Sequence, residues 1–264
     1  MEMEKELLVE VENVSKKFCK NLKWSMLHGI TDLGKIAVGT DLKRNKLRKE
    51  EFWALNDVSL KVHRGDLLCI LGNNGSGKTT LMRLIAGIYP VDKGQITVNG
   101  KVSSLFAIKS GMHPHFSGRE NIFIKGGMFG LTLEQINEKI DWIIDFSELG
   151  DFIDSPLGTY SSGMRSRLGY AIAVGTEPDV LIIDEGLAVG DASFRLKCFQ
   201  NLKSISKNCC IIFITHNIKR VKVLANRIMV IDKGKFVYEG TNVEEGMEFY
   251  IDECAKLVSR EFLS

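Results

Sequence analysis

Apolar and polar positions alternate near the start of the chain. In residues 7–18, LLVEVENVSKKF, the spacing places Val9, Val11 and Val14 in strand-like register, and residues 54–62, ALNDVSLKV, repeat the pattern. A period of two predicts strands with one buried face. The two segments therefore predict an antiparallel β layer whose strands frame the residues between them.

Continuous apolar runs follow later in the chain, at residues 67–71, 180–184, 209–215 and 227–232. Helical spacing separates them, beginning with TTLMRLIAGI after Lys78. Short apolar runs that alternate with helical patterns are typical of parallel strands buried on both faces. We therefore predict an α/β fold with a mainly parallel sheet.

Residues 112–177 have mainly helical patterns, with apolar positions at Ile136, Ile140, Ile143 and Ile144. A 3.6-residue period predicts helices packed through one face. We expect one domain over 1–264, with an inserted helical subdomain at 107–177 and a C-terminal helix at 243–264. The core is expected to consist of residues 1–106 and 178–242.

An insertion at residues 19–52 concentrates positive charge. Its basic residues are Lys20, Lys23, Lys35, Lys43, Arg44, Lys46, Arg48 and Lys49, against Asp32, Asp41, Glu50 and Glu51. With the apolar residues near its start, this segment is predicted either to contact anionic lipid or to be a solvated mobile loop.

The overall charge gives little information about partners, since 35 Lys and Arg against 33 Asp and Glu leave +2 in 264 residues. That balance gives no reason to expect a nucleic-acid partner. Six cysteines without C-x-x-C spacing favour a reducing compartment. The acidic N-terminus does not resemble a secretion signal, and no run approaches about 20 apolar residues, so we expect a cytoplasmic location.

A glycine-rich loop joins the run at 67–71 to the following helix. Its sequence, GNNGSGKT at 72–79, fits G-x-x-x-x-G-K-[ST], a phosphate-binding loop whose backbone N–H groups surround phosphate oxygens. An ordinary turn is the alternative, and the flanking strand and helix argue against it. We predict nucleoside triphosphate binding with Lys78 on the β- and γ-phosphates and Thr79 at Mg²⁺. The predicted contact residues are Asn73, Asn74, Gly75, Ser76, Gly77, Lys78, Thr79 and Thr80.

Two carboxylates, Asp184 and Glu185, end the apolar run at 180–183. Ligands of open α/β sheets bind at the carboxyl ends of the strands. We predict that Asp184 holds Mg²⁺ through water and that Glu185 polarises the attacking water. The alternative is that both residues merely end a strand.

A second anion site is predicted at residues 160–164, YSSGM, before a basic helix. Ser161, Ser162 and Gly163 offer hydroxyl and backbone donors at a helix N-terminus. One chain then carries two phosphate-binding segments.

The order of these segments resembles the nucleotide-binding domains of ABC transporters, with a P-loop NTPase (RecA-like) core. The resemblance covers the phosphate loop, the turn at 160–164, Asp184-Glu185, Gly190-Asp191 and His216. It implies two ATP molecules sandwiched in a homodimer. Ser162 and Gly163 are then expected to contact the γ-phosphate bound by the opposite subunit, and His216, as a catalytic residue, that of its own subunit.

The resemblance also implies an aromatic ring stacked on adenine. Phe18 occupies the matching position at the end of the first strand, and Trp53 is the competing residue.

Two segments depart from the common pattern. Residues 107–111 contain no Gln where the family carries one, and the turn reads Ser-Ser-Gly-Met rather than Ser-Gly-Gly-Gln. With HPHFSGREN at 113–121 and DEGLAVGD at 184–191, the sequence is similar to bacterial exporters of lipid-linked polysaccharides and teichoic acids. Since the chain ends at Ser264, we expect the kind without an appended sugar-binding domain.

This subfamily resemblance implies an integral membrane permease partner and a peripheral location on the cytoplasmic face of the inner membrane. It implies docking of the permease near residues 107–125. Alternatives are the ATPase subunit of an importer or drug exporter, a non-transport ABC ATPase, and a regulatory subunit that binds ATP without turnover.

Overall fold

The computed structural model describes residues 5–39, 46–106, 111–184, 190–215 and 218–261. Glu185 and His216, both expected to be catalytic, lie outside these ranges, and so does most of the 107–111 segment that lacks Gln.

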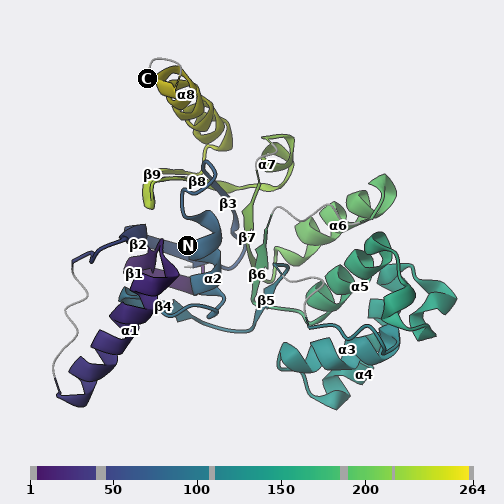
Figure 1. The fold of residues 1–264 in the computed structure, drawn as a ribbon. Helices are drawn as coiled ribbons and strands as arrows, with labels where there is room; N and C mark the ends of the chain where they lie inside the picture. Colours follow the sequence, from purple (N-terminus) through teal and green to yellow (C-terminus); the bar gives the residue numbers. More distant parts are fainter. Residues whose placement is uncertain (1–4, 40–45, 107–110, 185–189, 216–217, 262–264) are drawn as a thin grey trace.

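Two sheets form the centre of the molecule within the described residues (Figure 1). A three-stranded antiparallel sheet has the order β2-β1-β4, from β1 (Leu7–Cys19), β2 (Glu51–His63) and β4 (Lys93–Val98). A six-stranded sheet has the order β5-β6-β7-β3-β8-β9 and is parallel except for the β8–β9 pair. Its strands are β3 (Leu67–Leu71), β5 (Val102–Ser104), β6 (Val180–Ile183), β7 (Cys210–Ile214), β8 (Arg227–Asp232) and β9 (Lys235–Gly240). The predicted α/β class with a mainly parallel sheet is confirmed.

β3 shows why the apolar runs have no polar residues between their ends. Leu67, Cys69 and Leu71 belong to one buried apolar cluster, and Leu68 and Ile70 belong to another. Successive side chains of a strand point to opposite faces, so a strand covered on both faces must be apolar throughout. The first cluster joins the sheet to the helices at 118–175, and the second fills the space between the two sheets and α2 (Lys78–Ile85).

The segment expected to be helical contains α3 (Gly118–Met128), α4 (Leu133–Ser147) and α5 (Ser162–Gly175), with short 3-10 turns at Gly150–Asp154 and Leu157–Thr159. Capping boxes start α3 at Ser117 and α4 at Thr132, where side chains satisfy the first free N–H groups. Of the predicted apolar face of α4, Ile136 and Ile143 are buried. The remaining helices are α6 (Ala192–Ile205), α7 (Ile218–Leu224) and α8 (Val243–Glu261).

Three strands and one helix had not been predicted. β4, β5 and β9 are short and partly exposed, so their apolar patterns are weak. Within the basic insertion, α1 (Leu22–Ala37) is a helix of 16 residues, where the sequence interpretation had assigned no secondary structure. Figure 1 shows α1 beside the antiparallel sheet, directed away from the rest of the molecule.

Candidate functional site

The phosphate loop lies between β3 and α2, as its motif requires. β3 ends at Leu71, and α2 begins at Lys78 after Gly77, which has a left-handed φ of 113°. A Cβ at Gly77 would lie 2.6 Å from the backbone oxygen of Ala54, so close packing against β2 excludes any larger residue. The loop is therefore held in one shape by a neighbouring strand.

Lys78 is buried, and its Nζ donates to the carbonyl oxygens of Gly72 and Asn73 at 2.6 and 2.8 Å. These hydrogen bonds hold the ammonium group over the loop. The Ser76 hydroxyl is also buried. Gly75 has φ 79°, and a Cβ there would meet no atom within 4 Å, so this part of the loop faces open space.

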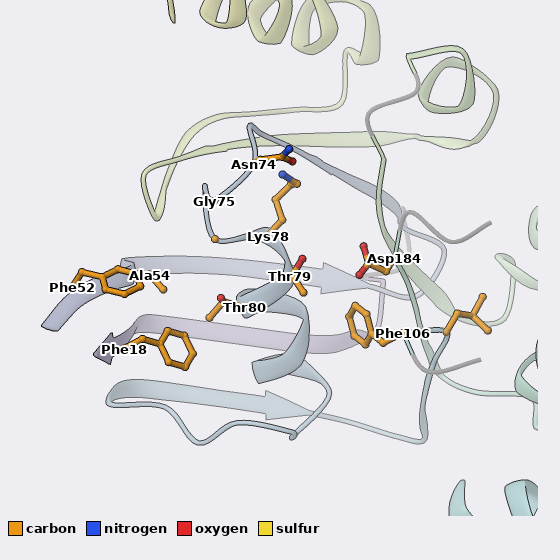
Figure 2. Close-up of a pocket in the computed structure, with 12 residues that line it drawn as sticks. Phe18, Phe52, Ala54, Asn74, Gly75, Lys78, Thr79, Thr80, Phe106 and Asp184 are labelled. Atoms are coloured by element: carbon orange, nitrogen blue, oxygen red, sulfur yellow. The ribbon is translucent and has the colours of Figure 1, made fainter. Parts of the chain in front are cut away.

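A cavity of about 580 Å³ opens at the loop (Figure 2). Seven of the predicted site residues line it: Phe18, Asn74, Gly75, Gly77, Lys78, Thr79 and Thr80, and the predicted metal residue Asp184 lines it too. Leu105 and Phe106 from the β5 region, and Phe52 and Ala54 from β2, complete the lining. Asn73 and Ser76 are not lining residues; their place is within the loop itself.

In Figure 2 the lining side chains extend from Phe18 and Phe52 at one end to Asp184 and Phe106 at the other. Lys78 and Thr79 lie between the two ends. An aromatic end, a cationic middle and a carboxylate end follow the order of base, phosphates and metal in a Mg²⁺-bound nucleoside triphosphate. The cavity therefore has the chemical layout that a nucleotide requires.

The aromatic end contains Phe52, which sequence reasoning missed. Phe18 and Phe52 are direct cross-strand partners on β1 and β2, with ring centroids 6.4 Å apart. Trp53, the expected competitor, is one residue further along β2 and does not line the cavity; Lys93 Nζ lies 5.1 Å from its ring centroid. Cross-strand neighbours share a face and the next residue takes the other. The strand register therefore selects Phe52 over Trp53.

The donor set formed by Thr79 and Asp184 fits a hard cation. The Thr79 hydroxyl and the Asp184 carboxylate both face the cavity, and Asp184 follows β6 at the carboxyl edge of the parallel sheet. Mg²⁺ is commonly held by one or two such oxygens together with substrate phosphates. The residues present thus fit a magnesium ion that binds with the nucleotide.

The second predicted anion site forms a separate cavity of about 410 Å³. Ser161 caps α5 by accepting from Met164 N at 3.1 Å, and Ser162 and Gly163 form the first turn. Among the described residues, none lines both this cavity and the one at the phosphate loop. The two predicted anion sites are therefore separate cavities of one chain.

Arg167 connects the second site to the segment after residue 189. Its guanidinium pairs with Asp191, which caps α6, and with Glu148 at the end of α4. Gly190 and Asp191 line the same cavity as Ser161, Ser162 and Gly163. The predicted Gly190-Asp191 segment is thus brought next to the serine turn.

Comparison with known proteins agrees with this geometry. The family described as ABC transporter matches residues 55–188. The chain belongs to the ABC transporter family.

Curated relatives indicate which members of the ABC transporter family this chain is similar to. The chain is 38% identical to the O-antigen export system ATP-binding protein RfbB of Klebsiella pneumoniae, over 77% of this chain and 83% of that protein. It is 38% identical to the teichoic acids export ATP-binding protein TagH of Listeria monocytogenes, over 92% of this chain and 73% of that protein. The ABC transporter protein AbcA of Aeromonas salmonicida is 43% identical, and the match spans 62% of its length.

Solved structures support the fold. A dimeric ATP-binding cassette in a post-hydrolysis state with ADP and Pi has a TM-score of 0.67 at 19% identity, covering 89% of this chain and 98% of that chain. An ATP-binding subunit of an ABC transporter gives a TM-score of 0.70 at 18% identity, covering 92% and 93% of the two chains. Within the described residues, none of the helices is long and apolar enough to span a membrane.

Proposed function

We propose that this chain is the ATP-hydrolysing subunit of an ABC exporter that moves lipid-linked polysaccharide or teichoic acid across the cytoplasmic membrane. The observation that carries the proposal is the cavity in which two aromatic rings, the phosphate loop and Asp184 lie in the order of a nucleotide's parts. The names of relatives at 38% identity, RfbB and TagH, support the transported class.

Different residues of the cavity bind different parts of the nucleotide. Adenine stacks on Phe18, and the phosphates accept from the backbone N–H groups of residues 73–80 and from Lys78. Thr79 and Asp184 hold Mg²⁺, which when bound neutralises charge on the β- and γ-phosphates. Glu185 orients and polarises the attacking water, and His216 contacts the γ-phosphate.

The separation of the two anion cavities supports action as a homodimer. A chain whose serine turn lies apart from its own phosphate loop completes the site when a second copy places Ser161, Ser162 and Gly163 over the bound ATP. Closure of the two copies then pulls on a membrane permease subunit docked near residues 107–125. The protein is accordingly peripheral, on the cytoplasmic face of the membrane.

The test of hydrolysis and dimer formation is the Glu185→Gln variant, with Glu134→Gln on exposed α4 as the matched control. ATP turnover and molecular mass in solution are measured with Mg²⁺. The Glu185 variant is expected to lose turnover and to gain an ATP-dependent dimer, because the amide no longer activates water while ATP still bridges the copies. A Glu185 variant that turns over ATP as fast as the control contradicts its catalytic role.

The exported class is tested in cells that lack the ATPase of an O-antigen or teichoic acid exporter. The chain is expressed with its permease, and surface glycan is measured. Surface glycan that depends on Lys78 supports the proposal. If glycan stays inside the cell while purified chains still hydrolyse ATP, the chain serves a different transported class.

A further inference from the structure

α1 has two faces that differ in what they contact. Residues spaced by four in a helix lie on one face, so Trp24, His28 and Asp32 share a side. Leu22, Met26, Ile30 and Leu33 lie on the opposite side, about half a turn away. The first set is tied to the body of the protein, and the second is exposed.

The anchored face contacts the segment just before β2. Arg48 donates to both carboxylate oxygens of Asp32, at 2.8 and 2.9 Å. His28 Nε2 lies 3.1 Å from the carbonyl oxygen of Lys49, whose ammonium group lies 4.5 Å from the centroid of the Trp24 ring. A bidentate ion pair and a cation–π contact fix the rotation of the helix about its axis.

That segment is itself held to the sheet. Glu51 accepts from Arg48 N and from Lys17 Nζ at 2.7 and 3.0 Å. Burial acts to raise the pKa of Glu51, but the hydrogen bonds from Arg48 and Lys17 outweigh it and keep the pKa below its ordinary value. The position of α1 is therefore set by ionised partners on β1 and β2.

The other face of α1 is an apolar stripe formed by Leu22, Met26, Ile30 and Leu33, with exposed fractions of 76, 63, 66 and 69%. Of the 18 large hydrophobic side chains exposed in the described residues, six lie between residues 22 and 38. A single exposed apolar residue is ordinary, but a continuous row on one helix marks a contact surface.

Positive charge borders the stripe. Lys20 precedes α1, and Lys23 is one turn from Met26 and Leu27 on the helix surface. In the described part of the chain, no carboxylate lies within ion-pair distance of Lys20 or Lys23. An apolar row bordered by lysines that no carboxylate neutralises is complementary to a surface with an apolar interior and anionic groups at its boundary.

We propose that the apolar stripe of α1 inserts into the headgroup region of an anionic lipid bilayer, with Lys20 and Lys23 on lipid phosphates. Helices of this kind lie in the membrane surface, and each basic residue adds attraction to anionic lipid. The inference rests on the proposed function, which places the membrane on the side of α3. Figure 1 shows α1 and α3 extending to the same side of the molecule, opposite α8.

The test uses the full chain without nucleotide and vesicles of phosphatidylcholine, with or without phosphatidylglycerol. The stripe variant carries Ile30→Glu and Leu33→Glu. The matched control is Leu133→Glu, because Leu133 on α4 is 69% exposed, as Leu33 is. Circular dichroism verifies folding, and flotation in a density gradient measures binding.

The unmodified chain and the control are expected to float with anionic vesicles and to be released by salt, since screening weakens surface charge attraction. The stripe variant is expected to bind anionic vesicles at least about tenfold more weakly, because it places two carboxylates against the bilayer. Failure of the unmodified chain to float, or equal binding by the stripe variant, overturns the proposal and assigns the stripe to a protein partner or a second copy.

ATP turnover measured on the same samples separates this inference from the proposed function. The stripe variant is expected to keep basal turnover, since neither substituted residue lines the nucleotide cavity. Normal ATP turnover without vesicle binding contradicts only the proposal that α1 binds lipid. Vesicle binding by a chain that never hydrolyses ATP contradicts only the proposed ATPase function.

Discussion

Replacing Phe18 by alanine tests the aromatic end of the cavity most directly. The ring lies against Phe52 on one side, and Tyr89 meets it edge-on with centroids 5.7 Å apart. Stacking of a base on such a ring contributes about 1–3 kcal/mol. Loss of this contact is therefore expected to raise the Kd for ATP about 5- to 150-fold.

The assay is equilibrium binding of a fluorescent ATP analogue, with the thermal midpoint as a measure of folding. Trp53→Ala is the control, because it removes a larger ring one residue from Phe52 that faces away from the cavity. Its Kd is expected to stay within about twofold of the unmodified chain, as for substitutions outside the binding site. Weakened binding in Trp53→Ala together with unchanged binding in Phe18→Ala would refute the assignment of the adenine end.

Three further predictions concern stability, measured by urea unfolding. Gly77→Ala is expected to cost about 2 kcal/mol or more, whereas Gly75→Ala costs about 1, because only the first Cβ collides with a neighbour, at 2.6 Å; equal losses contradict this reasoning. Asn121→Leu is expected to cost about 2–4 kcal/mol, because the buried amide bonds to His113, Phe116 and Ser117 before α3; a loss below about 1 kcal/mol argues against that role. Burial raises the pKa of the thiols of Cys198, Cys209 and Cys210 to about 12, so folding keeps these thiols neutral. The stabilisation that results is fully present below about pH 9, and as pH rises toward 12 the free energy of unfolding falls by about 1.4 kcal/mol per pH unit and thiol. A free energy of unfolding that does not change over this pH range refutes the prediction.

The local pattern of apolar and polar residues predicted much of the fold. The runs at 67–71, 180–183, 210–214 and 227–232 were predictable because strands covered on both faces are apolar between their ends, and burial of β3 and β6 shows this directly. The short strands β4, β5 and β9 were not predictable in this way. They are partly exposed, and pairing with neighbours distant in sequence, rather than local apolar content, holds them in place.

By itself, the sequence determined the chemistry of this protein, because a phosphate loop and a strand ending in a carboxylate need only a few residues in fixed order. The tertiary structure decided which residues that are distant in the sequence contact one another. Strand register chose Phe52 over Trp53 as the partner of Phe18, since neighbouring residues of a strand face opposite ways. Ion pairs from Arg48 determined which face of α1 is exposed, and contacts between residues far apart in the chain cannot be read from local spacing.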